Sequence, residues 1–171
     1  NTPPGDAPAQ PVGETGETRR FNAEQRVLLR LLLAIEDAEL SRSEATRLVE
    51  RITDFVDPDR NPRSEGAEDE RYLSSAFPYR APNRPLASVS ELRAVDEITP
   101  ELYGLIAPFF TVWPAEGSKV NLLTAPPEVL AALNDDDALE PLSAQQVARI
   151  IERRNDGMLN EVDTFIEDVM F

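Results

Sequence analysis

Residues 21–58 read FNAEQRVLLRLLLAIEDAELSRSEATRLVERITDFVDP, and this stretch decides the fold. It contains the pattern of an N-terminal helix cap twice, first as Asn22 with Gln25 and again as Ser41 with Glu44. Apolar residues follow each cap at helical spacing. We therefore predict two short amphipathic helices that pair as a hairpin, with the proline at the end of the stretch stopping the second helix.

Further short helices are predicted along the rest of the chain. Their start signals are Ser88 with Glu91, Thr99 with Pro100, Thr124 to Pro127, Ser143 with Gln146, and Asn160. Two segments, 110–113 and 119–122, have the pattern of minor strands that pair across a turn. Because strands and helices do not alternate as in a parallel sheet, the predicted fold class is mainly α with minor β, built from small paired helices.

The predicted organisation is one helical domain behind a leader. Residues 1–20 are rich in Pro, Gly and Thr with little to bury, so we interpret them as a flexible leader. Residues 21–171 form the domain: 21–87 carry the helical hairpin and two loops, one acidic and one proline-rich, and 88–171 the later helix pairs. Since the chain stops at Phe171 without a terminating tail, we expect it to be a fragment of a longer protein.

Composition excludes several classes of function. The formal net charge is −15, with 17 basic and 32 acidic residues, which disfavours binding to nucleic acid. The chain has no cysteine and no histidine, so thiol nucleophiles, disulfides, Ser-His pairs and ordinary zinc sites are excluded. The apolar run 27–35 contains Arg30 and is far shorter than the ~20 residues of a membrane span.

We predict that the chain is not an enzyme. Pairs of carboxylates serve glycosidases, but no pattern here places two acids in an apolar pocket. A carbohydrate-active enzyme stays open as an alternative class. It would show turnover on glycans that disappears when one carboxylate is replaced.

The acidic loop at residues 57–70 reads DPDRNPRSEGAEDE and is a candidate site for a divalent cation. Four oxygen-bearing side chains stand at its first, third, fifth and twelfth positions, as in a calcium-binding EF-hand: Asp57, Asp59, Asn61 and Glu68. The sixth position is Pro62 where an EF-hand needs glycine, so the loop is not an EF-hand. If the loop folds back on itself, the predicted ligands are Asp57, Asp59, Glu68 and Asp69. The alternative is a solvated loop that binds nothing.

Three further predictions concern single features. Phe109, Phe110 and Trp113 are expected in the core, as clustered aromatic residues usually are. Residues 134–140 are a second acidic stretch, which we interpret as a surface loop. Arg80 and Arg84 of the proline-rich loop are expected to pair with carboxylates of the acidic loop, without a functional role.

Four segments, taken in order, carry a resemblance to a known family. They are ITDFVDPDR with GAEDERY after it, PYRAPNRPLASVSELRAV, ITPELYGLIAPFFTV, and VNLLTAPPEVLAAL. Together they resemble the inserted helical domain of general secretion pathway protein K, a minor pseudopilin of the type II secretion system. The resemblance covers nearly everything except the leader.

The resemblance implies a fold, a function and a location. In that family the helical domain is inserted in a pilin-like α/β fold, in the periplasmic part of a protein anchored in the inner membrane of a Gram-negative bacterium. The family's role is structural: it sits at the pseudopilus tip with the I and J minor pseudopilins and contacts exported cargo. Some members carry calcium in this domain. This chain departs from the family pattern by lacking the hydrophobic helix and most of the pilin sheet.

One alternative comes from the segment VNLLTAPPEVLAAL at residues 120–133, which also resembles the first half of a helix-hairpin-helix module. In that module the backbone N–H groups of a glycine-containing hairpin contact a nucleic-acid phosphate. Here the following turn is Asn134-Asp135-Asp136-Asp137, which is acidic and lacks glycine. The predicted part at 88–171 is therefore helix-hairpin-helix-like or SAM-like in scaffold, and nucleic-acid binding is the alternative function.

Overall fold

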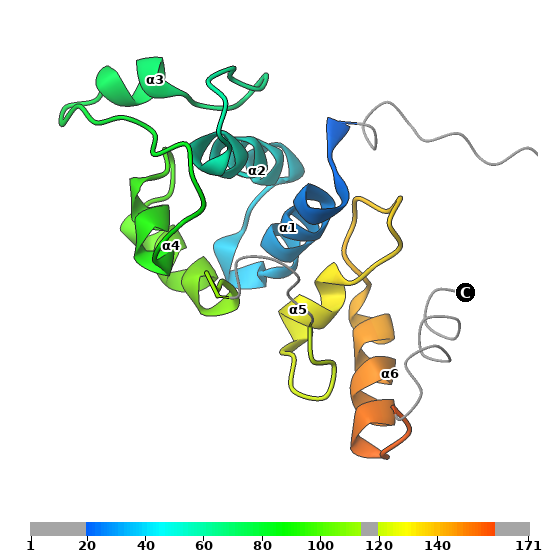
Figure 1. Cartoon of the computed structure of the whole chain (residues 1–171). Coiled ribbons are helices and arrows are strands. Elements are labelled where there is room, and N and C mark those ends of the chain that lie inside the picture. The colour runs from blue at the N-terminus through cyan, green and yellow to red at the C-terminus, as the bar shows by residue number, and fades with distance from the viewer. Residues whose placement is uncertain (1–19, 114–119, 160–171) are drawn as a thin grey trace, which may run out of the picture.

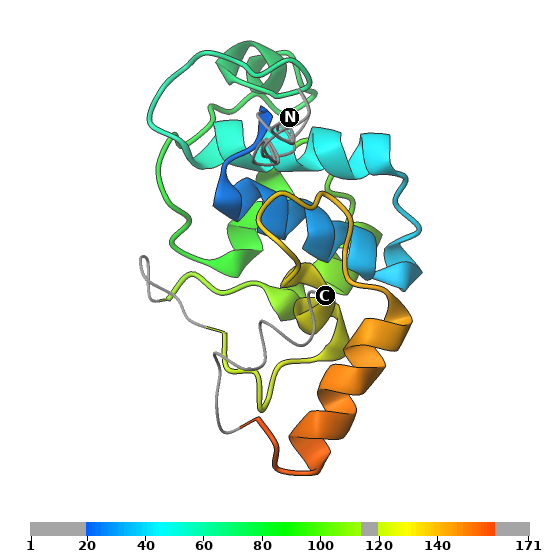
Figure 2. The same ribbon diagram turned by 90° about the vertical axis from the view of Figure 1, so that its right-hand side faces the viewer.

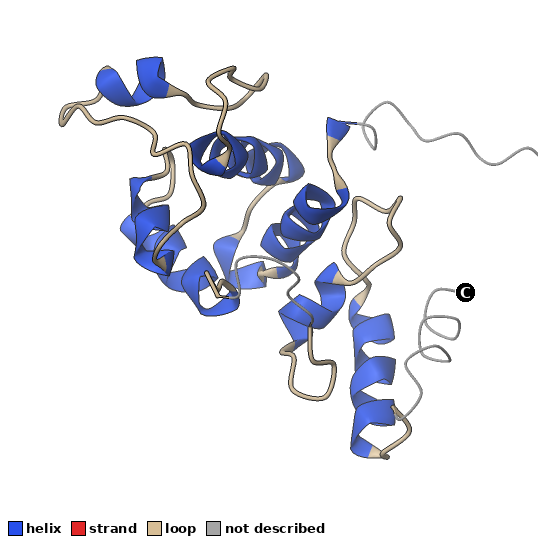
Figure 3. Ribbon diagram, in the orientation of Figure 1, coloured by secondary structure: helices blue, strands red, loops and turns tan. Residues whose placement is uncertain are grey.

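The computed structural model describes residues 20–113 and 120–159, and within these ranges it contains helices and no strand (Figure 3). This confirms the prediction of a mainly α fold. Residues 1–19 of the predicted leader, the start of the second predicted strand and the predicted helix from Asn160 lie outside the described residues. Among the described helices, none has the length and apolarity that crossing a bilayer requires.

The first two helices form the predicted hairpin. Helix α1 spans Ala23–Ala34 and α2 spans Arg42–Val56, with the short 3-10 helix η2, Glu36–Ala38, between them. Both capping boxes are present: Asn22 with Gln25 and Ser41 with Glu44 bond reciprocally through side chain and backbone. Each box satisfies two N–H groups that a helix start leaves unpaired, which is why the starts were readable from the sequence.

The later helices are short. They are α3 (Asp69–Leu73), η3 (Val89–Ala94), α4 (Pro100–Ile106), η4 (Ala107–Phe109), α5 (Pro127–Ala132) and α6 (Ala144–Asn155). Helix α3 was not predicted, because its five residues carry no apolar stripe. The capping box predicted for Ser143 with Gln146 is present at the start of α6.

Helix α6 ends where the sequence indicated. Gly157 adopts a left-handed conformation with φ 71°, and the N–H of Met158 donates to the carbonyl of Arg153 at 2.9 Å. Glycine reaches this conformation without strain, so it is the common residue just past a helix end.

Two hydrophobic clusters hold these helices together. The larger one joins α1, α2, α3, η3 and α4, and the smaller one joins α5, α6 and Leu159. Helix α5 packs against both α1 and α6 and so connects the two clusters. In Figures 1 and 2, α3 with the acidic loop lies at one end of the molecule and α6 at the other.

The predicted strands are wrong for the described residues. Phe110 is extended, but no neighbouring segment pairs with it, and Thr111 Oγ1 accepts the N–H of Trp113 at 3.2 Å to make a local turn. On the other side, the N–H of Ala125 donates to the carbonyl of Asn121 at 2.9 Å, which closes a second turn. Since both segments satisfy backbone groups locally, no ladder of hydrogen bonds forms.

The aromatic prediction is confirmed in part. Phe109 and Phe110 are partly buried against the larger cluster. Trp113 is 81% exposed, so the expectation that it lies in the core is wrong. Trp113 follows the local turn at Thr111, and neither hydrophobic cluster of the described residues includes it.

Candidate cation site

The acidic loop begins where α2 ends, at Asp57. The N–H of Asp57 still donates to Thr53 O at 2.9 Å, but Asp57 is itself extended, with φ −78° and ψ 157°. Pro58 favours that conformation in the residue before it, and so ends the helix. Asp59 follows and is exposed, with its Oδ1 accepting the N–H of Asn61 at 2.7 Å.

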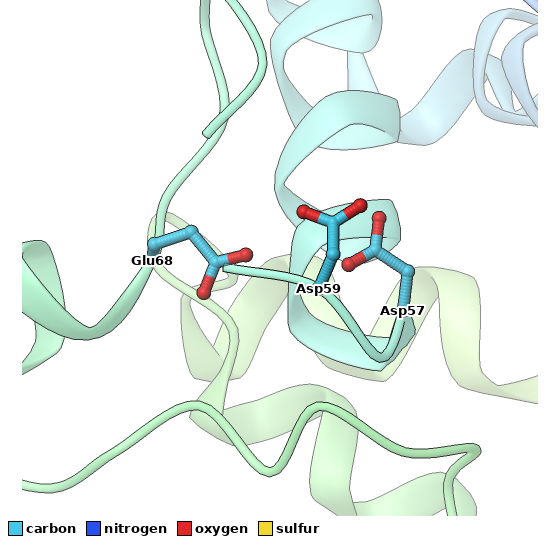
Figure 4. Close-up of side chains that lie close together, drawn as sticks. All are labelled: Asp57, Asp59 and Glu68. Atoms are coloured by element: carbon cyan, nitrogen blue, oxygen red, sulfur yellow. The ribbon is translucent and has the colours of Figure 1, made fainter. Parts of the chain in front are cut away.

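The loop returns to these two aspartates through Glu68, the residue before α3. Asp57, Asp59 and Glu68 each place one carboxylate oxygen within 4.8 Å of the others. Figure 4 shows the Glu68 carboxyl directed across the loop toward the two aspartates at the end of α2. Glu68 is only 6% exposed. The fold therefore brings together three of the four carboxylates named from the sequence.

Asp69, the fourth predicted ligand, lies outside this cluster. Its Oδ2 accepts Arg80 Nη1 at 2.7 Å and its Oδ1 accepts the N–H of Ala81 at 3.2 Å. Asp69 is the first residue of α3, and both of its carboxylate oxygens are bonded to the proline-rich loop. The predicted pairing of Arg80 with the acidic loop is confirmed here, whereas Arg84 pairs with Glu91 of η3.

Asn83 belongs to the cluster and was missed. Its Nδ2 donates to the backbone carbonyl of Asp59 and, at 3.5 Å, to Glu68 Oε2. Asn83 has a φ of 46°, a left-handed conformation that asparagine adopts more readily than most residues. The signal in the sequence was an asparagine between two prolines, in PNRP. It was read only as part of an ordered loop.

Several buried oxygens at this site have no hydrogen-bond donor. Asp57 Oδ1, Glu68 Oε1 and Asn83 Oδ1 are all inaccessible and unpartnered. A buried acceptor without a partner costs roughly 1–3 kcal/mol. Burial raises the pKa of the Glu68 carboxyl, and the negative charges of Asp54, Asp57 and Asp59 raise it further, against a hydrogen bond from Asn83 that lowers it. Among the described residues, Arg63 is bonded to the other oxygen of Asp57, and no donor reaches Asp57 Oδ1 or Glu68 Oε1.

A hard divalent cation fits this set of oxygens. Calcium binds six to eight oxygens at about 2.4 Å, so two ligands on opposite sides of one ion stand about 4.8 Å apart. Carboxylate and amide oxygens are the ligands that calcium prefers. A bound ion would give the unpartnered oxygens of Asp57 and Glu68 a positive partner. Asn83 Oδ1 would join them if its amide turned, since its Nδ2 now faces Glu68 Oε2.

A bonded pair beside the site, Arg63 and Asp54, holds the loop in place. Arg63 Nη1 bonds Asp54 Oδ1 at 2.5 Å and Asp57 Oδ2 at 2.7 Å, and among the described residues Oδ1 of Asp57 has no partner. Asp54 is fully buried, and this burial raises the pKa of its carboxyl against the bonds from Arg63. Gly66 passes so close that a Cβ there would lie 1.8 Å from Asp54 Oδ2.

A second clamp holds the loop to the middle of α2. The buried Glu50 accepts the backbone N–H of Glu65 at 2.7 Å and Arg20 Nε at 2.5 Å. Burial raises the pKa of Glu50, but the bonds from Arg20, Glu65 and Ser64 outweigh it, so the net pKa lies below the ordinary value. The loop is therefore anchored by two buried acids of α2, Glu50 and Asp54.

The second acidic stretch is arranged differently. The carboxylates of Asp135, Asp136 and Asp137 are exposed, and this turn is anchored by Arg30 of α1, which is 1% exposed. Arg30 donates at 2.7 Å to each of three backbone carbonyls, those of Ala132, Asp135 and Ala138. The buried arginine was noted in the sequence only as a break in an apolar run.

This geometry gives no support to the nucleic-acid alternative. A phosphate-binding hairpin presents free backbone N–H groups. Here the N–H of Asp135 donates to Asn134 Oδ1 at 2.8 Å, and that of Asp137 donates to Asp135 Oδ1 at 2.9 Å. The turn thus presents carboxylates outward, and its carbonyls are taken by Arg30.

Two family models match the chain, and together they span most of it. Both are described as type II secretion system (T2SS), protein K; one matches residues 10–115 and the other residues 120–170.

Individual relatives carry the same description. A type II secretion system protein K of Pectobacterium carotovorum is 30% identical over 127 residues, which is 74% of this chain and 38% of the relative. That of Pseudomonas aeruginosa is 42% identical over 91 residues, 53% of this chain and 27% of the relative. A putative protein K of Escherichia coli K12 is 34% identical over 86 residues, 50% of this chain and 26% of the relative. The chain thus spans no more than 38% of these three relatives.

A solved structure has the same fold. It is a chain of the GspK-GspI-GspJ complex from the type II secretion system of enterotoxigenic Escherichia coli. The match has a TM-score of 0.57 and 25% sequence identity, and covers 81% of this chain and 59% of that chain.

Proposed function

Because this chain belongs to the type II secretion system protein K family, we propose that it is the helical part of a minor pseudopilin that acts in protein export. The role is structural and not catalytic: the chain contributes a surface to the tip of a pseudopilus. The observation that carries this proposal is the match of two protein K models to residues 10–115 and 120–170. The parent protein is then anchored in the inner membrane, with this part in the periplasm.

The proposed partners are the I and J minor pseudopilins. The solved chain that shares this fold was determined in a GspK-GspI-GspJ complex. That chain extends well beyond the matched region, since the match covers 59% of it. We propose that the parent protein contacts I and J partly through segments outside the present sequence, and exported cargo is a further proposed partner.

The test uses the whole parent protein. Its globular part is co-expressed with its own I and J subunits, and the mixture is separated by size-exclusion chromatography with light scattering. We expect a complex that contains all three subunits. A globular part that elutes alone at micromolar concentration, with I and J present and folded, would contradict the proposed assembly role.

We also propose that calcium acts as a structural clamp at the loop, held by Asp57, Asp59, Glu68 and Asn83. The unpartnered buried oxygens of three of these residues support this. The ion would supply positive charge that joins the end of α2, the start of α3 and the proline-rich loop. Thermal melts in calcium and in chelator test the proposal, with a higher melting temperature expected in calcium. Identical melts would rule the clamp out.

A further inference from the structure

An apolar groove lies on the opposite side of the helical hairpin from the acidic loop. It has a volume of about 690 Å³ and is bounded by the end of α1 with η2, by α4 with η4, by α5, and by the first half of α6. Among the apolar side chains that line it are Leu33, Leu105, Phe109, Val147 and Ile151. Val147 and Ile151 stand one helical turn apart on α6. Helices therefore supply most of the residues that line the groove.

Among the described residues, those that carry charge in this groove are all acidic. They are Glu36 and Asp37 of η2 and Glu128 of α5, and no lysine or arginine of the described ranges lines it. Glu36 and Asp37 are exposed and Glu128 is partly exposed. Like charges gathered around an apolar surface favour a ligand with an apolar face and positive flanks.

The charge of each candidate ligand decides which of them suits this acidic groove. A second copy of this chain carries a net charge of −15 and would add repulsion. The chain's own residues 160–171 hold apolar side chains, but they carry four carboxylates and no lysine or arginine. Neither complements three carboxylates, whereas a cationic segment of another protein does.

We infer that this groove docks an amphipathic helix of a different protein, with an apolar stripe that enters the groove and Lys or Arg residues beside it. Helix-in-groove recognition places anchors at i, i+3, i+4 and i+7 along one face, which matches a groove bounded by helices. The carboxylates of Glu36, Asp37 and Glu128 set the sign of the flanking charge. This inference does not depend on the proposed cation site or on assembly with I and J.

The probe is a fluorescein-labelled synthetic peptide of about 15 residues, a length at which an amphipathic peptide begins to hold helix. It carries Leu at the four anchor positions and Lys on its polar face. A matched peptide carries Glu in place of Lys. Fluorescence anisotropy against the whole chain, at near-physiological salt, is expected to show binding of the Lys peptide at least about tenfold tighter than the Glu peptide.

A groove-filling variant separates docking from general attraction to an acidic protein. Gly104 of α4 lines the groove, and a Cβ there would meet nothing within 4 Å. Gly104→Phe is expected to weaken binding of the Lys peptide at least about tenfold, a loss of about 1.4 kcal/mol, without changing charge. The matched control is Ala23→Phe at the exposed start of α1, which is expected to bind as the unmodified chain does.

Two triple variants test whether the three carboxylates of the groove contribute to peptide binding. One removes the three groove carboxylates, as Glu36→Gln, Asp37→Asn and Glu128→Gln. The other removes three exposed carboxylates outside the groove, as Glu24→Gln, Glu70→Gln and Glu152→Gln. Both lose the same net charge, but only the first is expected to weaken binding of the Lys peptide.

Four outcomes would overturn the inference. The first is that Gly104→Phe binds the Lys peptide as tightly as the unmodified chain does. The second is that the two charge variants lose the same affinity. Either result would mean that the acidic chain attracts the peptide without binding it in the groove. Self-association that Gly104→Phe abolishes would assign the groove to a second copy. Peptide binding that appears only when Phe165 and Ile166 are changed to Ser would assign it to the chain's own residues 160–171.

Discussion

The molecule has two acidic turns that look alike in sequence and are opposites in structure. At 57–68 the carboxylates of Asp57 and Glu68 are drawn inward and keep buried oxygens without a partner. At 134–138 the aspartates stay exposed, and the backbone carbonyls turn inward to a buried arginine. The number of acidic residues is therefore a poor guide to a cation site. What distinguishes the first turn is the burial of carboxylate oxygens, Asp57 Oδ1 and Glu68 Oε1, that no donor of the described residues reaches.

The largest effect is expected from Arg30→Met, which removes the positive group of the second turn. It leaves three carbonyls that now bond Arg30 without their donor, two of them in part-buried positions. We expect the free energy of unfolding to fall by about 3 kcal/mol or more, measured by urea denaturation. Arg149→Met on the exposed side of α6 is the control and should stay within about 0.5 kcal/mol. Equal stability of the two variants would break the comparison.

The next effect is the increase in stability that calcium produces, which we compare between variants of the two turns. At about 100 times its Kd, calcium would add about 2.7 kcal/mol, or roughly 5–10 °C in Tm for a chain of this size. Asp57→Asn with Glu68→Gln should abolish the shift. Asp135→Asn, Asp136→Asn and Asp137→Asn together should keep it in full. If the triple variant loses the calcium-dependent shift in Tm and the double variant keeps it, the ion binds at the second turn and the proposed site is wrong.

Asn83→Ala sharpens the same comparison at the level of one ligand. If the Asn83 side-chain oxygen binds the ion, its removal should weaken calcium affinity without removing a charge. We expect a loss of about tenfold, measured by titration calorimetry, because the carboxylates remain. Asn61→Ala, on the exposed part of the loop, is the matched change and should leave the affinity as it was.

The close packing of Gly66 against Asp54, which positions the first turn, can be tested by adding a methyl group. Gly66→Ala would place a methyl group 1.8 Å from Asp54 Oδ2, on a buried side chain that Arg63 holds in place. We expect a loss of about 1–3 kcal/mol in unfolding free energy. Gly104→Ala, where the added Cβ has open space, should instead stabilise α4 by about 0.5–1 kcal/mol. Opposite signs for two identical substitutions are the expected result.

The smallest effect is a pH dependence from Glu50, which anchors the first turn to α2. Its pKa is lowered in the folded state, because the bonds from Arg20, Glu65 and Ser64 outweigh the burial that raises it. An acid with a lowered folded pKa stabilises the fold above its ordinary pKa, and this contribution is lost as the pH falls through the folded value. Glu50→Gln should therefore flatten the acid limb of the stability curve, followed by denaturation at several pH values. Glu24→Gln, on the exposed start of α1, should leave that limb as steep as before.

Part of the candidate site was predictable, and the limits are physical. The spacing of Asp57, Asp59 and Glu68 indicated one loop that brings them together, since residues in a short loop cannot be far apart. No pattern in the sequence separates Glu68 from its neighbour Asp69, because the direction of each side chain depends on how α3 packs. Asn83 comes from another loop altogether, and only the packing of the proline-rich segment places it over the acidic one.

What the sequence by itself determined is local. The caps at Asn22, Ser41 and Ser143 join residues three apart, so they are set before any tertiary contact forms. The order of four segments likewise sufficed to indicate the protein K family. What only the tertiary structure decided depends on contacts between distant residues. Arg30 bonds carbonyls more than 100 positions away, and Trp113 lies exposed because none of the described helices packs over it. Such contacts follow from how whole helices pack, which no local pattern of residues encodes.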